Sequence, residues 1–175
     1  AVVVNSKTQR TGVCNAMETL LIDKSITRNL LQQIAGALLE KNVELRADEA
    51  AKEILGEATI AATNEDWDTE FLDLICAIRI VDGVDGALEH INQHGSGHTE
   101  SIITENETTA RRFQNEVDAS TIFWNASTRF SDGGEFGMGA EIGISTDKIG
   151  ARGPMGLTEL TTYKWLGEGN GLIRT

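Results

Sequence analysis

Cys14 is the residue of this sequence best suited to nucleophilic chemistry. It lies between a polar segment that carries Lys7, Arg10 and Gly12 and an apolar segment that begins at Leu20. A thiol at the start of a helical turn and beside cations ionises more easily than a free thiol, because both the helix N-terminus and the positive charges stabilise the thiolate. The sequence therefore predicts a reactive Cys14 with a lowered pKa. The alternative is that Cys14 is a small buried apolar side chain.

The second cysteine, Cys76, lies in the apolar run 74–78 and is expected in the core. Two cysteines far apart in the sequence do not indicate a disulfide framework. This cysteine usage is typical of a protein from a reducing cytoplasm.

His90, His94 and His98 are spaced so that one continuous helix would align them as metal ligands. Gly95 and Gly97 predict that the helix ends before His98, so no metal site is expected. The glycines of segment 134–139 have the wrong spacing for a dinucleotide-binding loop, and no strand, helix and downstream acid surround them in the required order.

Alternating apolar patterns predict an α/β fold, in which a parallel sheet has helices on both faces and binds ligands at the carboxyl ends of its strands. Strands are expected at 18–23, 43–46, 72–81, 101–104 and 121–124, and helices at 25–41, 48–55, 84–93 and 106–116. Ser25 is the expected N-cap of the first helix, and Thr104 with Glu107 forms the expected capping box of the last. The helix at 25–41 has one apolar face, made of Ile26, Leu30, Leu31, Ile34, Leu38 and Leu39. Residues 160–166 are a further candidate strand, which would pair elsewhere.

The formal net charge of −12 argues against a nucleic-acid partner, because binding phosphates along a duplex needs clustered lysines and arginines. No apolar run approaches the roughly 18 residues of a membrane span, so no membrane partner is expected. A small anionic ligand is compatible with this charge, because Lys7, Arg10, Arg129 and Arg152 lie outside the acidic stretch 40–73.

Long stretches of the sequence resemble one enzyme family. The segment 7–21, with Lys7-Thr8-Gln9-Arg10 before Gly12-Val13-Cys14-Asn15-Ala16, and the segments 125–137, 139–146 and 151–157 resemble the signatures of gamma-glutamyl phosphate reductase, or glutamate-5-semialdehyde dehydrogenase, of the aldehyde dehydrogenase superfamily. Thr11 departs from the pattern, because the family commonly has proline there.

The resemblance implies an aldehyde dehydrogenase-like catalytic domain at residues 1–150 and a C-terminal arm at 151–175 that helps subunits associate into a homo-oligomer. A complete member of the family is more than twice as long as this chain and begins with the domain that binds most of the NADP or NADPH. That N-terminal domain is expected to be absent from these residues.

The resemblance also implies a reaction. The Cys14 thiolate attacks L-glutamyl 5-phosphate, phosphate leaves, and the thioester is reduced with hydride from NADPH to L-glutamate 5-semialdehyde in proline biosynthesis. The backbone N–H of Cys14, with the turn at Asn15, is the candidate oxyanion donor. Such a reductase could receive its substrate by channelling from glutamate 5-kinase.

The expected binding residues are Arg10, Ser127, Thr128, Arg129 and His98 for the substrate and Glu70 for the nicotinamide ribose. The Phe-Gly-Pro that follows the corresponding glutamate elsewhere in the superfamily is missing after Glu70. The alternative for Glu70 is an ordinary exposed carboxylate, and the alternative for Arg129 is a structural ion pair with Glu135 or Glu141.

Two other functions stay open at this point. An aldehyde-oxidising dehydrogenase of the same superfamily would hydrolyse the thioester with water. A non-catalytic assembly or binding module would associate with partners without turnover. The sequence does not distinguish a stand-alone reductase from half of a bifunctional synthase.

Overall fold

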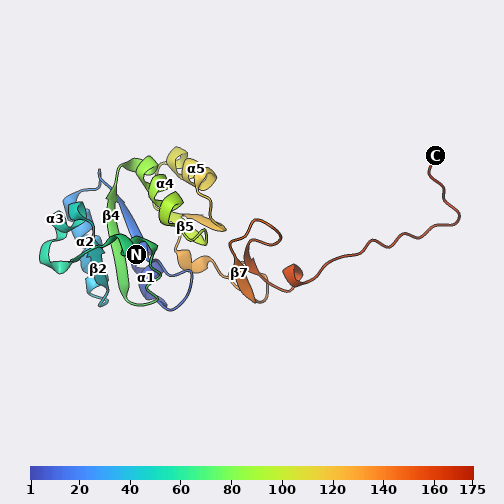
Figure 1. Ribbon diagram of the computed structural model, residues 1–175, viewed down its shortest axis with the longest axis horizontal. Helices are drawn as coiled ribbons and strands as arrows, with labels where there is room; N and C mark the ends of the chain where they lie inside the picture. The colour runs from blue at the N-terminus through green and yellow to red at the C-terminus, as the bar shows by residue number, and fades with distance from the viewer.

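A computed structural model describes residues 1–175 and contains five α-helices and eight strands (Figure 1). In chain order the elements are α1 (Val2–Thr8), β1 (Thr19–Asp23), α2 (Arg28–Leu39), β2 (Glu44–Ala47), α3 (Glu49–Leu55), β3 (Ile60–Ala61), β4 (Ile75–Val81), α4 (Gly83–His94), β5 (Thr99–Ile102), α5 (Glu107–Glu116), β6 (Thr121–Trp124), β7 (Gly143–Ser145) and β8 (Gly153–Met155). Short 3₁₀ helices lie at η1 (Gly56–Ala58), η2 (Asn64–Asp68), η3 (Thr128–Phe130) and η4 (Thr158–Leu160).

The main sheet has four parallel strands in the order β1-β4-β2-β3. Strand β4 is central and is an almost uninterrupted apolar run, as expected for a parallel strand that is covered on both faces. Helices α2 and α3 lie on one side of this sheet and α4 lies on the other (Figure 1). The predicted three-layer α/β arrangement is therefore confirmed.

The main core lies between the sheet and helices α2 and α3. Leu31, Ala35 and Leu38 of α2 are buried against residues of β2 and β4 that include Leu45 and Ile78. Cys76 is fully buried in the same core, as predicted. The predicted apolar face of α2 is wrong at two positions, because Leu30 is 41% exposed and Leu39 is 37% exposed.

Replacing Leu38 with Ala should lower the free energy of unfolding by about 2–5 kcal/mol, because the side chain is fully buried and its removal leaves a cavity. The neighbouring Leu39→Ala variant should cost far less, since Leu39 already reaches solvent. Urea unfolding of both variants measures the difference. Equal denaturant midpoints would contradict this packing of α2.

Two predicted helix caps are wrong. Helix α2 begins at Arg28 and not at residue 25, because Thr27 Oγ1 accepts from the backbone N–H of Leu30 at 3.3 Å, whereas Ser25 N–H donates to the Asp23 carboxylate at 2.7 Å. Helix α5 is capped by Asn106, whose side chain accepts from Thr109 N–H at 3.0 Å, and no Thr104–Glu107 capping box forms.

The remaining strands do not join the main sheet. Strands β5 and β6 form a parallel pair, and α4 and α5 pack on each other around a second small core of Leu88, Phe113 and Val117. Strands β7 and β8 form an antiparallel pair. The predicted strands at 101–104 and 121–124 are thus present, the first shifted to Thr99–Ile102, but they belong to a separate sheet.

Beyond η4 the chain leaves the globular part as an extended segment (Figure 1). The candidate strand at 160–166 does not form within this chain, because no neighbouring strand is present for it to pair with. Tyr163, Trp165 and Leu166 of this segment are 80%, 90% and 78% exposed. None of the helices is both long enough and apolar enough to cross a membrane.

Candidate active site

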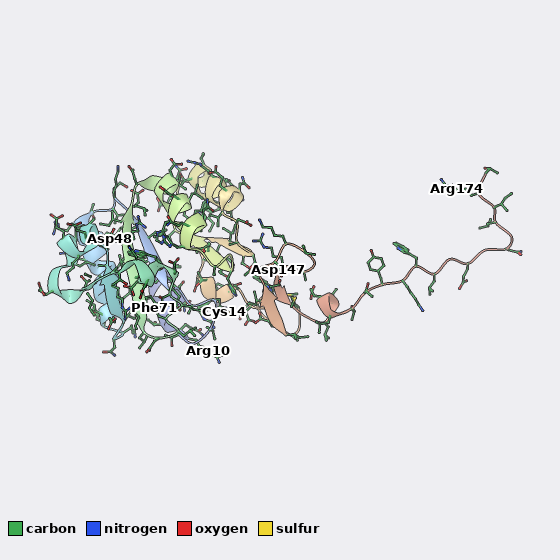
Figure 2. All side chains as sticks on the ribbon, in the orientation of Figure 1. Arg10, Cys14, Asp48, Phe71, Asp147 and Arg174 are labelled. Carbon is green, nitrogen blue, oxygen red and sulfur yellow. The ribbon has the colours of Figure 1, made fainter.

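Cys14 lies in an exposed turn before β1, in the loop that connects α1 to the main sheet. A hydrogen bond from Ala16 N–H to Val13 O of 3.0 Å closes this turn, and no helix begins here. The predicted helix N-terminus beside Cys14 is therefore wrong. Figure 2 shows Cys14 and Arg10 on the side of the globular part that faces the β7–β8 pair.

The site does not lie at the carboxyl ends of the strands of the main sheet. Cys14 precedes β1, and Glu70 precedes β4, which pairs with β1 in parallel. Both residues are therefore at the amino edge of the main sheet, whereas Arg129 follows the carboxyl end of β6. The reason is the order along the chain: the loop that carries Cys14 leads into β1, and the loop that carries Glu70 leads into β4.

The pKa of Cys14 is raised above its ordinary value, in contrast to the prediction. Burial of the thiol against the surrounding loops is the largest cause, although the residue as a whole reaches solvent, and the charges of Glu141 and Glu70 act in the same direction. The backbone N–H of Cys14 and the charge of Arg129 oppose the shift. Lys7, one of the two cations that precede Cys14 in this segment, is fully buried and binds Glu18 at 2.8 Å.

His98 belongs to the same electrostatic cluster. Burial lowers the pKa of His98, while the charges of Glu70 and Glu141 raise it. The imidazole Nδ1 bonds Thr99 Oγ1 at 2.6 Å, and the buried Nε2 has no hydrogen-bond partner. His98 lies beyond the end of α4 at His94, as the glycines predict. Cys14 and His98 therefore lie within electrostatic range of the same two carboxylates, Glu70 and Glu141.

Asn15 anchors the turn that presents Cys14. Its side-chain amide donates to Ser131 O at 2.8 Å, and its Oδ1 is buried without a partner. The backbone N–H groups of Cys14 and Asn15 donate to no other protein oxygen. The Cys14 N–H also acts on its own thiol, and the side-chain hydrogen bond of Asn15 fixes the turn that carries both groups.

Arg129 comes from η3, which follows β6. Its Nε donates to Gln9 Oε1 at 2.7 Å, and it forms no ion pair with Glu135 or Glu141. The alternative of a structural ion pair is therefore wrong. The Arg129 charge stays without a carboxylate partner and lies close enough to Cys14 to act on its pKa.

Ser127 and Thr128 both form hydrogen bonds with Ser6 of α1. Ser127 Oγ lies 3.0 Å from Ser6 Oγ and accepts from Arg129 N–H at 3.3 Å, and Thr128 N–H donates to Ser6 Oγ at 3.3 Å. Both side chains are buried, and Thr128 Oγ1 has no partner. Ser127 therefore shapes the turn that carries Arg129.

Arg10 and Glu70 are exposed and form no hydrogen bond or ion pair through their side chains. Arg10 lies in the same loop as Cys14, and Glu70 lies in the segment between η2 and β4. Glu70 acts on the pKa of both Cys14 and His98, so its carboxylate borders the site.

The sequence pattern missed α1 and the place of Glu141. Ser6 and Gln9, at the end of α1, bind the Ser127–Arg129 turn. Glu141 accepts from Gly133 N–H at 2.8 Å and acts on the pKa of Cys14. Gly133 belongs to the predicted signature segment 125–137. A side chain does not fit at this position, because a Cβ would lie 2.9 Å from Ala140 O.

The raised pKa predicts a slow reaction of Cys14 with iodoacetamide in this chain. Only the thiolate reacts, so the alkylation rate should still rise with pH above pH 9. Glu141→Gln, which keeps an acceptor for Gly133 N–H, should shift the curve to lower pH. Cys76, fully buried and with its pKa raised to about 12, is the unreactive control. A rate that levels off below pH 8 would contradict this electrostatic assignment.

The chain is similar to known proteins over nearly its whole length. No family model matches the chain. The gamma-glutamyl phosphate reductase of Dehalococcoides mccartyi is 55% identical over 177 aligned residues, which cover 99% of this chain and 42% of that protein. The crystal structure of gamma-glutamyl phosphate reductase from Thermotoga maritima is 50% identical and superposes with a TM-score of 0.94, again over 99% of this chain and 42% of the other.

Over 99% of its length the chain is homologous to curated gamma-glutamyl phosphate reductases. It spans about 42% of the length of the curated relatives it matches. An acetylating aldehyde dehydrogenase from Geobacillus thermoglucosidasius, 19% identical with a TM-score of 0.68 over 99% of this chain and 48% of the other, has the same fold. The predicted aldehyde dehydrogenase-like fold and the resemblance to gamma-glutamyl phosphate reductases are therefore confirmed.

Proposed function

We propose that this chain is the catalytic part of an NADPH-dependent gamma-glutamyl phosphate reductase, which converts L-glutamyl 5-phosphate to L-glutamate 5-semialdehyde and phosphate. The observation that carries the proposal is the Cys14 turn. It combines an accessible thiol, two free backbone N–H groups and the unpaired cations Arg10 and Arg129 inside a segment that matches the reductases.

Acyl transfer begins at the Cys14 sulfur. The thiolate forms a bond to the acyl carbon, the carbonyl oxygen takes up the negative charge, and the bond to phosphate breaks as the carbonyl reforms, which leaves a thioester and inorganic phosphate. The free N–H groups of Cys14 and Asn15 stabilise the charged oxygen. Arg129 and Arg10 bind the phosphate or the substrate carboxylate through charge-assisted hydrogen bonds.

The surroundings of Cys14 also account for its raised pKa. Burial of the thiol and the charges of Glu141 and Glu70 raise the pKa of Cys14, while its own backbone N–H and the charge of Arg129 lower it. Closing the site with the rest of the protein and with substrate changes this balance. Burial lowers the pKa of His98, and its buried Nε2, which has no protein partner, can bind substrate.

The residues at the edge of the site fit a nicotinamide cofactor. Glu70 is exposed and unpaired, and it is close enough to Cys14 to act on its pKa, so its oxygens can accept hydrogen bonds from ribose hydroxyls beside the thiol. When bound, reduced NADP supplies the hydride that converts the thioester to the aldehyde and frees the thiol. Most of the cofactor's contacts are assigned to the N-terminal domain found in complete members of the family.

The domain assignment follows from the same proposal. Residues 1–150 form the catalytic domain and residues 151–175 form an arm for subunit association, since the exposed apolar side chains of the extended segment need a surface to cover them. A homo-oligomer is therefore proposed, along with a cytoplasmic location. Substrate channelling from glutamate 5-kinase is compatible with an acyl phosphate substrate.

The reverse reaction tests the proposal. In a complete reductase that contains this sequence, L-glutamate 5-semialdehyde should reduce NADP+ only when inorganic phosphate is present, because phosphate must accept the acyl group from Cys14. Arsenate should replace phosphate, and sulfate serves as the control anion. Equal rates without phosphate would instead support an aldehyde-oxidising dehydrogenase, and no turnover in either condition would support a non-catalytic module.

A further inference from the structure

The loop that carries Cys14, residues 9–17 (the nucleophile loop), is closed by a buried ion pair. Lys7 at the end of α1 and Glu18 just before β1 stand on either side of this loop, and Lys7 Nζ lies 2.8 Å from Glu18 Oε2. The Lys7 side chain is 0% exposed and that of Glu18 is 18% exposed. Glu18 is the only hydrogen-bond partner of the Lys7 ammonium.

The same carboxylate reaches a second loop. The segment between η2 and β4, residues 69–74 (the Glu70 loop), carries the carboxylate that borders the site. Leu72 in this loop donates its backbone N–H to Glu18 Oε1 at 3.3 Å. Leu72 has a φ of 53°, an unfavourable conformation for a residue with a side chain, so the loop needs an external contact to hold it.

The end of α1 also reaches the turn that carries Arg129. Ser6 binds Ser127 Oγ and Thr128 N–H, and a backbone hydrogen bond of 3.0 Å from Met17 N–H to Ser6 O lies beside the ion pair. The loops around the site are therefore connected to two successive residues of α1, Ser6 and Lys7. Ser6 fixes the Arg129 turn, and Lys7 fixes the nucleophile and Glu70 loops through Glu18.

Such an ion pair is a costly way to stabilise a fold, because the Lys7 ammonium loses its hydration and the Glu18 carboxylate loses most of it. Apolar residues of similar size would fill the same space, but they could not accept a hydrogen bond from Leu72. The Lys7–Glu18 ion pair therefore suits a role in positioning the two loops better than a role in stabilising the fold alone.

We infer that Lys7 and Glu18 are positioning residues of the site. The ion pair sets the geometry of the nucleophile loop, and the second oxygen of Glu18 sets the position of the Glu70 loop relative to Cys14. Neither residue needs to touch the substrate. The kinetic part of this inference rests on the proposed reductase function, whereas the structural part does not.

Two variants separate the two contacts in a complete reductase that contains this sequence. Glu18→Gln removes the charge pair but keeps an oxygen for Leu72 N–H. The double variant Lys7→Met/Glu18→Leu removes both contacts and leaves no buried charge, so it should fold even where the single variant is unstable. Leu38→Ala is the control for lost stability, because Leu38 lies in the α2 core.

Hydrogen exchange by mass spectrometry gives the readout that does not depend on function. Glu18→Gln should accelerate exchange in the nucleophile loop alone, and the double variant should accelerate it in both loops. The Leu38→Ala control should change neither loop selectively. Unchanged exchange in both loops of the double variant would overturn the inference, whatever the enzyme does.

Kinetics give the second readout. Glu18→Gln should lower kcat by about tenfold to a hundredfold with little change in the KM for NADP+, because a small displacement of the nucleophile slows the chemical step. The double variant should also raise the KM for NADP+. Parental kinetics in the double variant would refute the positioning role. A parent enzyme without phosphate-dependent turnover would refute the proposed function and leave the exchange result to decide the structural claim.

Discussion

Replacing Cys14 with Ser should lower turnover of a complete reductase containing this sequence by about a thousandfold or more, since a hydroxyl is far less nucleophilic than a thiolate at neutral pH. Cys14 is exposed in a turn, so the substitution removes no core packing. The variant should therefore unfold at the parental temperature. The phosphate-dependent reduction of NADP+ measures the activity.

Cys76→Ser is the matched control. It removes a buried thiol that lies far from solvent in the core, so it should lower stability without removing the chemical step. A Cys14→Ser enzyme that keeps parental turnover would exclude Cys14 as the nucleophile. Loss of turnover in the folded Cys76→Ser variant instead would point to the wrong cysteine.

Replacing Arg129 with Ala should raise the KM for the phosphorylated substrate by roughly 10-fold to 100-fold, the effect of losing a hydrogen bond to a charged group worth about 1.5–3 kcal/mol. The guanidinium binds only the neutral Gln9 side chain, so its charge is available to a ligand. The same variant should shift the alkylation curve of Cys14 to higher pH, because the Arg129 charge lowers that pKa.

Arg111→Ala controls for the loss of one positive charge. Arg111 lies on α5, is largely exposed, pairs with Glu107 and stacks on Trp124, and its charge is not among those that shift the pKa of Cys14. Its replacement should leave both KM and the Cys14 alkylation curve unchanged. An Arg129→Ala enzyme with parental KM would remove Arg129 from the substrate site, and an equal effect of Arg111→Ala would show only a general charge effect.

The regular elements of the main sheet could be predicted from the sequence. The apolar run of β4 and the helical periodicity of α2 are strong local signals, and the Asp48 cap of α3 lies directly before its helix. Caps within a few residues of one another were harder to assign. Thr27 and Asn106 compete with Ser25 and Thr104, and only the path of the chain decides which side chain reaches a free N–H group.

The candidate site residues were named from sequence motifs, and these motifs did not predict the environment of those residues. The β-branched run Val2-Val3-Val4 hides α1, which is held by packing on the main core and not by helix propensity. The pairing of Lys7 with Glu18 depends on how β1 returns beneath α1, and a sequence cannot show that a cation near Cys14 is turned away from it. The sequence likewise does not show the burial of the Cys14 thiol, which is the largest cause of its raised pKa.

Separate short segments thus supply the functional groups of the candidate site. A turn presents the thiol, η3 presents a cation without a partner, and the Glu70 loop presents a carboxylate, while α1 binds the loops together. An activated nucleophile needs the balance between Glu141, Glu70 and Arg129 to change. Binding of substrate and of the rest of the protein is where that change is expected.

The most direct test of the account is peptide mass spectrometry of a complete reductase containing this sequence, mixed with L-glutamate 5-semialdehyde and NADP+ but no phosphate. The account predicts that NADPH forms in one burst equal to the enzyme concentration and that a glutamyl thioester appears on the peptide with Cys14, then disappears when phosphate is added. Continuous NADPH formation without phosphate, or an acyl group on any other residue, would contradict it.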